Sequence, residues 1–120
     1  MKQKTIQDFT QERDRLNNIM AKYTSLQTNR FLSLDNQMYR EGALPQDTKE
    51  LLGLVASLVL RCDDCVTYHL KNCFDLKFSD LQIEEALSIG LLVGGSIVIP
   101  HMRRAFATWD EMRKNESETK

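Results

Sequence analysis

The sequence predicts an all-α fold of about six helices. Apolar residues recur at helical spacing through most of the 120 residues, and no segment sustains the alternating pattern of a half-buried strand. Two prolines and five glycines are too few for the many turns of an all-β chain. We therefore expect one all-α domain over residues 1–120, long enough to form its own hydrophobic core.

The first two predicted helices cover the N-terminal third. The first spans about 5–25, where a helical stripe broken by Arg13 contains Ile6, Phe9, Leu16, Ile19, Met20 and Tyr23. A polar connector over 25–29 leads to a second helix over 30–39, whose apolar face holds Phe31, Leu34 and Met38. Gly42 is expected to end that helix, because glycine is the least strained residue at a left-handed C′ position.

The third and fourth predicted helices are separated by a short turn near Arg61. The third begins after Pro45, and its 51–60 segment is apolar almost all round, which predicts burial on most sides. The fourth starts near Cys62 and runs to about Leu76.

The last two predicted helices carry clear boundary signals. Ser79 followed by Gln82 is a capping box for the fifth helix. Close approach of another backbone, or a break, is expected at Gly90, Gly94 and Gly95. Pro100 ends or kinks this region. The final helix, over 101–113, has a core or subunit-contact stripe of Met102, Ala105, Phe106, Trp109 and Met112, and 115–120 is a polar tail.

Composition excludes several classes of protein. Sixteen basic and 17 acidic residues give a net charge of −1, which argues against a nucleic-acid partner. The longest uncharged stretch, 86–99, is shorter than the roughly 20 residues that span a bilayer, and the N-terminus lacks the apolar core of a signal peptide. Three cysteines do not suit a disulfide-framed secreted scaffold. We expect a cytoplasmic protein with reduced thiols and no membrane partner.

The residues that can perform chemistry gather in a C-x-x-C pair followed by a histidine. On a helix beginning at Cys62, the side chains of Cys62, Cys65 and His69 fall within an arc of about 60°. The helix N-terminus favours thiolate over thiol. One thiolate can attack a peroxide or disulfide, and the other can then close an intramolecular disulfide. His69 can accept the thiol proton. The order in which the sulfurs react stays open.

Glu50 is the fourth candidate site residue. If the third and fourth helices form an antiparallel hairpin, Glu50 lies level with about 69–73. Its carboxylate would then orient His69 and stabilise the protonated imidazole, as the third member of a triad does. The alternative is an ordinary first-turn acid that completes a cap with Asp47.

Some features oppose the redox interpretation. Asp63 and Asp64 place two negative charges between the cysteines, and nearby anions disfavour a thiolate. Acidic residues are, however, also favoured in the first turn of a helix. The cysteine pair has a second interpretation, as two buried structural thiols.

A metal site is not expected. A zinc set would combine Cys62, Cys65, His69 and Cys73, but on one helix Cys62 and Cys73 are about 16 Å apart along the axis. Cys73 is interpreted as a small core residue. His101 is expected to be structural or on the surface, and Arg103 and Arg104 to form a solvated face.

The spacing of Glu50, Cys62, Cys65 and His69 resembles a known family. It matches the E-x11-C-x-x-C-x3-H pattern of the alkylhydroperoxidase D branch of the carboxymuconolactone decarboxylase superfamily. The flanking residues Thr48 to Leu51, Tyr68 to Leu70 and Glu84 to Gly95 are also similar, and the resemblance is strongest over 44–107.

The resemblance implies a function. Members are all-α, assemble as trimers or hexamers, and in this branch reduce peroxides or disulfides through the cysteine pair, with the Glu and His as a proton relay. The implied catalytic residues are Glu50, Cys62, Cys65 and His69. The implied electron donor is a thiol or a lipoyl or thioredoxin-like protein, and no cofactor is implied. The alternative is a non-redox decarboxylase-like or ligand-binding oligomeric module.

Two positions depart from the family pattern. Some peroxidase members have a histidine immediately before the second cysteine, where this chain has Asp64, so weaker thiolate activation is expected. Many relatives have glycine after the cysteine helix, where this chain has Lys77; a non-glycine residue in a left-handed cap costs about 1 kcal/mol.

Overall fold

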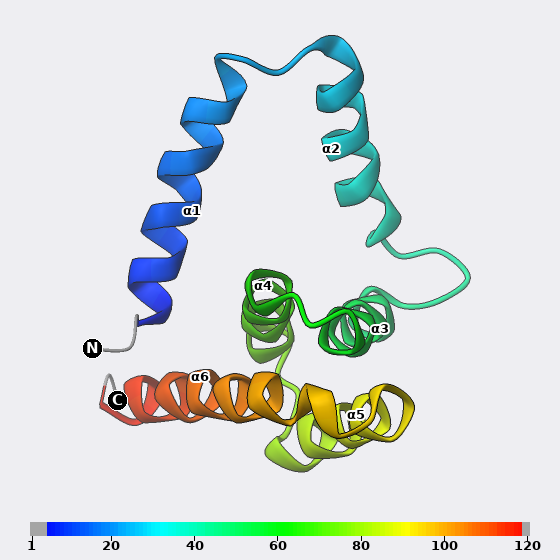
Figure 1. Ribbon diagram of the computed structural model, residues 1–120, viewed down its shortest axis with the longest axis vertical. Coiled ribbons are helices and arrows are strands. Elements are labelled where there is room, and N and C mark those ends of the chain that lie inside the picture. Colours follow the sequence, from blue (N-terminus) through cyan, green and yellow to red (C-terminus); the bar gives the residue numbers. More distant parts are fainter. Residues whose placement is uncertain (1–4, 119–120) are drawn as a thin grey trace. The chain divides into compact units, whose positions relative to one another are not determined.

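The computed structural model describes residues 5–118, which form six α-helices, one turn of 3₁₀-helix and no strand (Figure 1). This confirms the predicted all-α class. Contacts divide the chain into two compact units, residues 1–46 and 47–120. The single-domain interpretation stays a prediction.

The first unit contains α1 (Ile6–Ala21) and α2 (Leu26–Met38), and neither helix has a buried residue. Thr5 and Asp8 form a capping box at the start of α1. The predicted connector over 25–29 is wrong, because Ser25 is the extended N-cap of α2 and the polar residues after it form the first helical turn. Gly42 is not in a left-handed conformation, and α2 ends earlier, at Met38.

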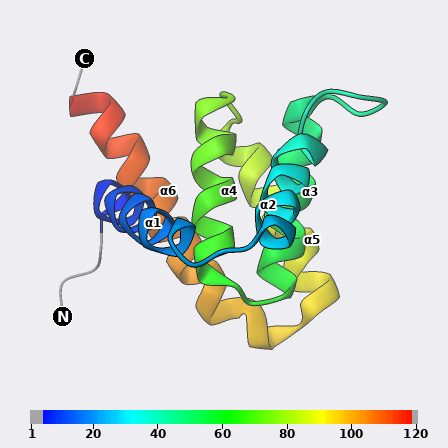
Figure 2. The same ribbon diagram turned by 90° about the horizontal axis from the view of Figure 1, so that it is seen from above.

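The second unit begins with α3 (Gln46–Val59) and α4 (Asp63–Asp75), which lie side by side in both views (Figures 1 and 2). Each of the two helices ends in a turn of the same type. The residue at C′ has a positive φ, 62° for Arg61 and 72° for Lys77. The amide of the next residue, Cys62 or Phe78, donates to the carbonyl five residues earlier. These are Schellman motifs built without glycine. The left-handed cap that the family resemblance implied at Lys77 is therefore present.

The rest of the unit is α5 (Asp80–Gly94), a 3₁₀ turn at Ser96–Val98 and α6 (Ile99–Glu118). The predicted capping box of Ser79 and Gln82 is present. Gly90 allows α5 to approach α3, since a Cβ there would lie 2.8 Å from Leu58 Cδ2. Gly95 breaks the helix with a φ of 85°. Pro100 does not end a helix but lies in the first turn of α6, where a missing N–H removes no helical hydrogen bond.

The length of α6 also differs from the prediction. It continues to Glu118 instead of ending at Arg113, so the first residues of the predicted polar tail are helical, and positions 119–120 lie outside the described residues. A polar sequence can extend a helix whose preceding turns are already fixed by packing.

The hydrophobic core of the second unit draws on all four of its α-helices. Its buried side chains are Leu54, Leu58, Val66, Leu70, Cys73, Ile83, Ala86, Leu87, Val98, Ala105, Trp109 and Met112. The core interpretation of Cys73, Trp109 and Met112 is confirmed. Burial of the 51–60 segment on most sides is wrong, because Leu52 and Leu60 are 55% and 76% exposed.

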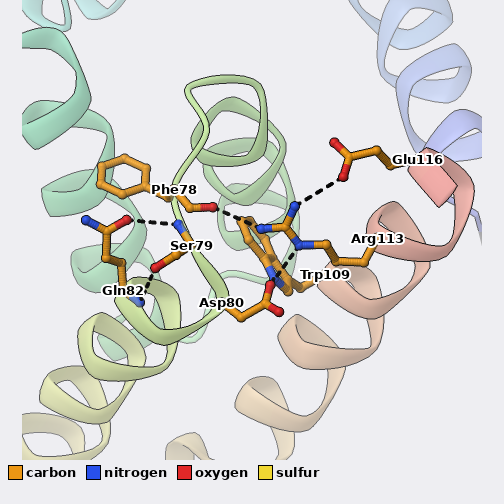
Figure 3. Close-up of polar contacts among 7 residues, drawn as sticks. All are labelled: Phe78, Ser79, Asp80, Gln82, Trp109, Arg113 and Glu116. Atoms are coloured by element: carbon orange, nitrogen blue, oxygen red, sulfur yellow. Dashed lines mark hydrogen bonds and ion pairs between the residues drawn. The ribbon is translucent and has the colours of Figure 1, made fainter. Parts of the chain in front are cut away.

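A polar clamp fixes α6 to the start of α5 (Figure 3). Trp109 Nε1 and Arg113 Nε both donate to Asp80 Oδ1, each at 2.7 Å. Two hydrogen bonds lower the pKa of Asp80. The larger effect comes from Trp109 and the next from Arg113. The Arg113 guanidinium also donates to the Phe78 carbonyl at 3.2 Å and lies 5.1 Å from the centre of the Phe74 ring.

None of the helices in residues 5–118 combines the length and the apolar character needed to cross a bilayer.

The left-handed conformation of Lys77 predicts a stabilising substitution. Lys77→Gly should raise the free energy of unfolding by roughly 0.5–1 kcal/mol, because it removes the Cβ strain at positive φ at some cost in chain entropy. Lys77→Ala is the matched control: it removes the same side chain and keeps the Cβ. Urea unfolding of both variants checks this, and an equal gain in the alanine variant would contradict it.

Candidate active site

Cys62 lies where one helix ends and the next begins. Its amide donates to the carbonyl of Ser57 at 3.1 Å, which completes the Schellman motif of α3. Its sulfur accepts a hydrogen bond from the amide of Cys65 at 3.3 Å, so Cys62 is also the N-cap of α4. The backbone of Cys62 is thus fixed by both helices.

Cys62 and Cys65 form a disulfide within the chain, and their Cα atoms are 5.3 Å apart. The prediction that the two sulfurs share one end of the helix is confirmed. Cys65 is exposed and Cys62 is half-buried, so the bond can be approached from solvent. Amide groups at the helix N-terminus favour negative charge on sulfur, as the contact from the Cys65 amide illustrates.

His69 and Glu50 form a buried contact between α4 and α3. His69 Nδ1 lies 2.6 Å from Glu50 Oε1, and the two side chains are 9% and 6% exposed. The same oxygen accepts a hydrogen bond from Asn72 Nδ2 at 3.1 Å. The predicted proximity of Glu50 and His69 is confirmed. Asn72 was missed, although its position three residues after His69 places it on the same helix face.

The contact with Glu50 fixes the proton arrangement of the His69 ring. A carboxylate accepts hydrogen bonds and does not donate them, so Nδ1 must hold the proton. Nε2 is then the nitrogen that carries the lone pair when the ring is neutral. This is the arrangement required of a base that exchanges a proton through Nε2.

Cys73 is a buried thiol in a different environment. Burial raises the pKa of Cys73 to about 12, with a smaller contribution from the negative charge of Glu50. It stays a thiol at neutral pH, and only the pair at the helix N-terminus is placed for thiolate chemistry.

A second carboxylate and imidazole meet at the N-terminus of α4. Asp63 Oδ1 lies 2.7 Å from His101 Nδ1, and Asp63 Oδ2 accepts a hydrogen bond from Arg104 Nε at 2.9 Å. Arg104 is exposed, as expected of a solvated face, and it also forms this ion pair. No sequence signal reveals this contact, because it depends on where α6 packs against α4. Asp64 and Arg103 are exposed.

Within residues 5–118, no three His, Cys, Asp or Glu side chains come together as a metal site would require.

The family model described as the carboxymuconolactone decarboxylase family matches residues 28–108. The chain belongs to the carboxymuconolactone decarboxylase family. The match includes the cysteine pair, Glu50 and His69. It also includes Asp63, His101 and Arg104. An uncharacterised protein of Cupriavidus necator is 29% identical over 73 residues, which are 61% of this chain and 65% of that relative.

Solved structures of the family have the same fold. Two crystal structures of one Thermotoga maritima protein are 52% and 51% identical to this chain, with TM-scores of 0.89 and 0.88. Each covers 92% of this chain, and the matches cover 96% and 94% of the Thermotoga chain. That protein is described as a carboxymuconolactone decarboxylase family protein, for which involvement in an antioxidative response has been suggested. An apo family protein of Legionella pneumophila, 22% identical, matches 88% of this chain and 91% of its own with a TM-score of 0.71.

The buried contact predicts a stability difference between two substitutions of Glu50. Glu50→Ala should lower the free energy of unfolding by roughly 1–3 kcal/mol, because His69 and Asn72 lose their buried acceptor. Glu50→Gln keeps an acceptor oxygen and should cost less. Urea unfolding at neutral pH compares the two, with Leu52→Ala as an exposed control on α3. Equal losses for the two Glu50 variants would contradict the prediction.

Proposed function

We propose that this protein is a thiol-dependent oxidoreductase that reduces peroxides or disulfides through Cys62 and Cys65. The observation that carries the proposal is an accessible disulfide at a helix N-terminus, followed one turn later by a histidine that a buried carboxylate holds. Glu50 and His69 act as the proton relay. The family membership and the antioxidative role suggested for the Thermotoga relative support the same class of reaction.

The reductive half-reaction begins at the exposed sulfur. A thiolate of a dithiol donor attacks Sγ of Cys65, and the bond to Cys62 breaks. Cys62 leaves as a thiolate, to which the amide of Cys65 donates. The second donor thiolate then attacks the mixed disulfide, releases Cys65 and forms the donor disulfide. Two electrons and two protons pass from the donor to the cysteine pair.

The oxidative half-reaction returns the pair to the disulfide. The Cys65 thiolate attacks the terminal oxygen of a hydroperoxide, the O–O bond breaks, and Cys65 becomes a sulfenic acid. The departing alkoxide takes a proton from the relay and leaves as an alcohol. Cys62 then attacks the sulfenic sulfur and water leaves. When the substrate is a disulfide, the same pair reduces it to two thiols by thiol–disulfide exchange.

The electron donor proposed is a thiol or a lipoyl or thioredoxin-like protein, because a vicinal dithiol can complete both exchange steps without dissociating. The cysteine pair itself carries the electrons, so the proposed reaction uses no cofactor. A cytoplasmic, reducing location is part of the proposal, since the cycle needs thiols to regenerate the pair.

Replacing either cysteine of the pair tests the proposed function. Cys62→Ser and Cys65→Ser should each abolish peroxide-dependent oxidation of a dithiol donor, since one sulfur cannot close the intramolecular disulfide. Peroxide consumption with dihydrolipoamide as donor measures this, and mass spectrometry identifies the oxidised species. If Cys65 attacks first, a sulfenic acid accumulates in Cys62→Ser.

Cys73→Ser is the control for these variants, because Cys73 lies outside the proposed site and should not change turnover per folded molecule. Unchanged turnover in both Cys62→Ser and Cys65→Ser would contradict the redox function. It would favour the alternative, a non-redox decarboxylase-like or ligand-binding module.

We further propose that the chain forms a homo-oligomer, with a trimer or hexamer as the family resemblance implies. Neither α1 nor α2 buries a residue, and α5 exposes Leu92 and Val93 by 80% and 69%. Apolar faces of this kind are commonly covered by another subunit. Sedimentation at micromolar concentration should give a trimer or hexamer, and a monomer alone would contradict this.

A further inference from the structure

The contact between Asp63 and α6 joins the first turn of the cysteine helix to two basic side chains. Asp63 directly follows Cys62, and each of its oxygens has one partner, His101 Nδ1 at 2.7 Å and Arg104 Nε at 2.9 Å. The side chains of Asp63, His101 and Arg104 are 45%, 20% and 53% exposed. The three residues are called the tip cluster below.

The proton arrangement of the tip cluster follows from its distances. Arg104 Nη2 lies 3.1 Å from His101 Nδ1, and an arginine nitrogen only donates. If Nδ1 accepted a hydrogen bond from Arg104, it would hold no proton. Two hydrogen-bond acceptors, Nδ1 and Asp63 Oδ1, would then lie only 2.7 Å apart, which is unfavourable. Nδ1 therefore holds a proton and donates to Asp63. The carboxylate thus receives one hydrogen bond from an imidazole and one from a permanent cation.

Because Asp63 is next to Cys62 in the chain, the pairing of its carboxylate affects how readily Cys62 forms a thiolate. An unpaired anion one residue from Cys62 would disfavour a thiolate at the helix N-terminus. Arg104 supplies the opposite charge from a different helix, and Asp63 can keep its favourable place in the first turn of α4. The charge that opposes thiolate formation in the sequence is compensated in the fold.

We propose that Arg104 and His101 are positioning residues for the cysteine pair, which compensate the charge of Asp63 and so maintain the thiolate form of Cys62. This inference rests on the proposed function, because it assigns the two residues to the same redox site. Neither needs to touch the substrate, since both act through Asp63. The remaining charged residues of this turn, Arg61 and Asp64, are exposed, as is Arg103 on α6.

The test measures thiolate formation directly, without turnover. The full-length protein is reduced, and the rate of alkylation of Cys62 and Cys65 by iodoacetamide is followed against pH, with peptide mass spectrometry to separate the two sites. Arg104→Gln should slow alkylation of Cys62 at neutral pH by about two- to fivefold, because Asp63 loses its counter-charge. Asp63→Asn should speed it by a similar factor, because Arg104 is then uncompensated.

The double variant separates electrostatics from structure. Asp63→Asn with Arg104→Gln removes both charges and should return the alkylation profile close to wild type. Arg104→Lys keeps the positive charge and should also remain close to wild type. Arg103→Gln makes the same charge change at the neighbouring exposed position and should shift the profile less than Arg104→Gln does.

A purely structural role predicts a different pattern. Loss of the contact between α4 and α6 would lower the thermal midpoint of both Arg104→Gln and Asp63→Asn. It would also change the alkylation rate of Cys62 in the same direction in both variants. Changes of the same sign, or no change in Arg104→Gln, would overturn the proposal. If the Cys62→Ser and Cys65→Ser variants keep their turnover but the alkylation rates shift with opposite signs, the proposed function fails and the charge compensation stands.

Discussion

The turn between α3 and α4 is the constraint on which the rest of the site depends. Arg61 adopts a left-handed conformation that ends α3, and Cys62 then completes the motif with its amide and caps α4 with its sulfur. Because only residues 60–62 separate α3 from α4, the two helices lie side by side and antiparallel. That path brings Glu50, near the start of α3, level with His69 on α4. The position of the sulfurs and the contact between Glu50 and His69 therefore share one cause.

The three cysteines lie on or next to one helix but in different electrostatic surroundings. Cys62 and Cys65 lie at an exposed helix N-terminus, where backbone amides stabilise negative charge. Cys73 lies on the same helix, but burial and the Glu50 carboxylate raise its pKa to about 12. The buried carboxylate that orients His69 thus also helps to keep the third sulfur protonated. A single charged group serves both purposes because α4 presents His69 and Cys73 on one face, one turn apart.

The two carboxylate–imidazole contacts work under different physical conditions. Glu50 and His69 are shielded from water, so their geometry is fixed and loss of one partner leaves a buried polar group unsatisfied. Asp63, His101 and Arg104 are partly exposed, and water weakens their interaction. Their contribution to stability is correspondingly small. Their effect on sulfur does not require a large energy, because an equilibrium between thiol and thiolate responds to a fraction of a kcal/mol.

The sequence by itself determined the helical class, the capping box of α5, and the spacing that aligns Cys62, Cys65 and His69. These are local properties, set by residues within one or two turns of each other. It also indicated Glu50 on the assumption of a hairpin. Only the tertiary structure decided that the first turns of α6 place His101 and Arg104 against Asp63. Such contacts join positions about forty residues apart, and packing angles between helices are set by whole faces rather than by any local signal.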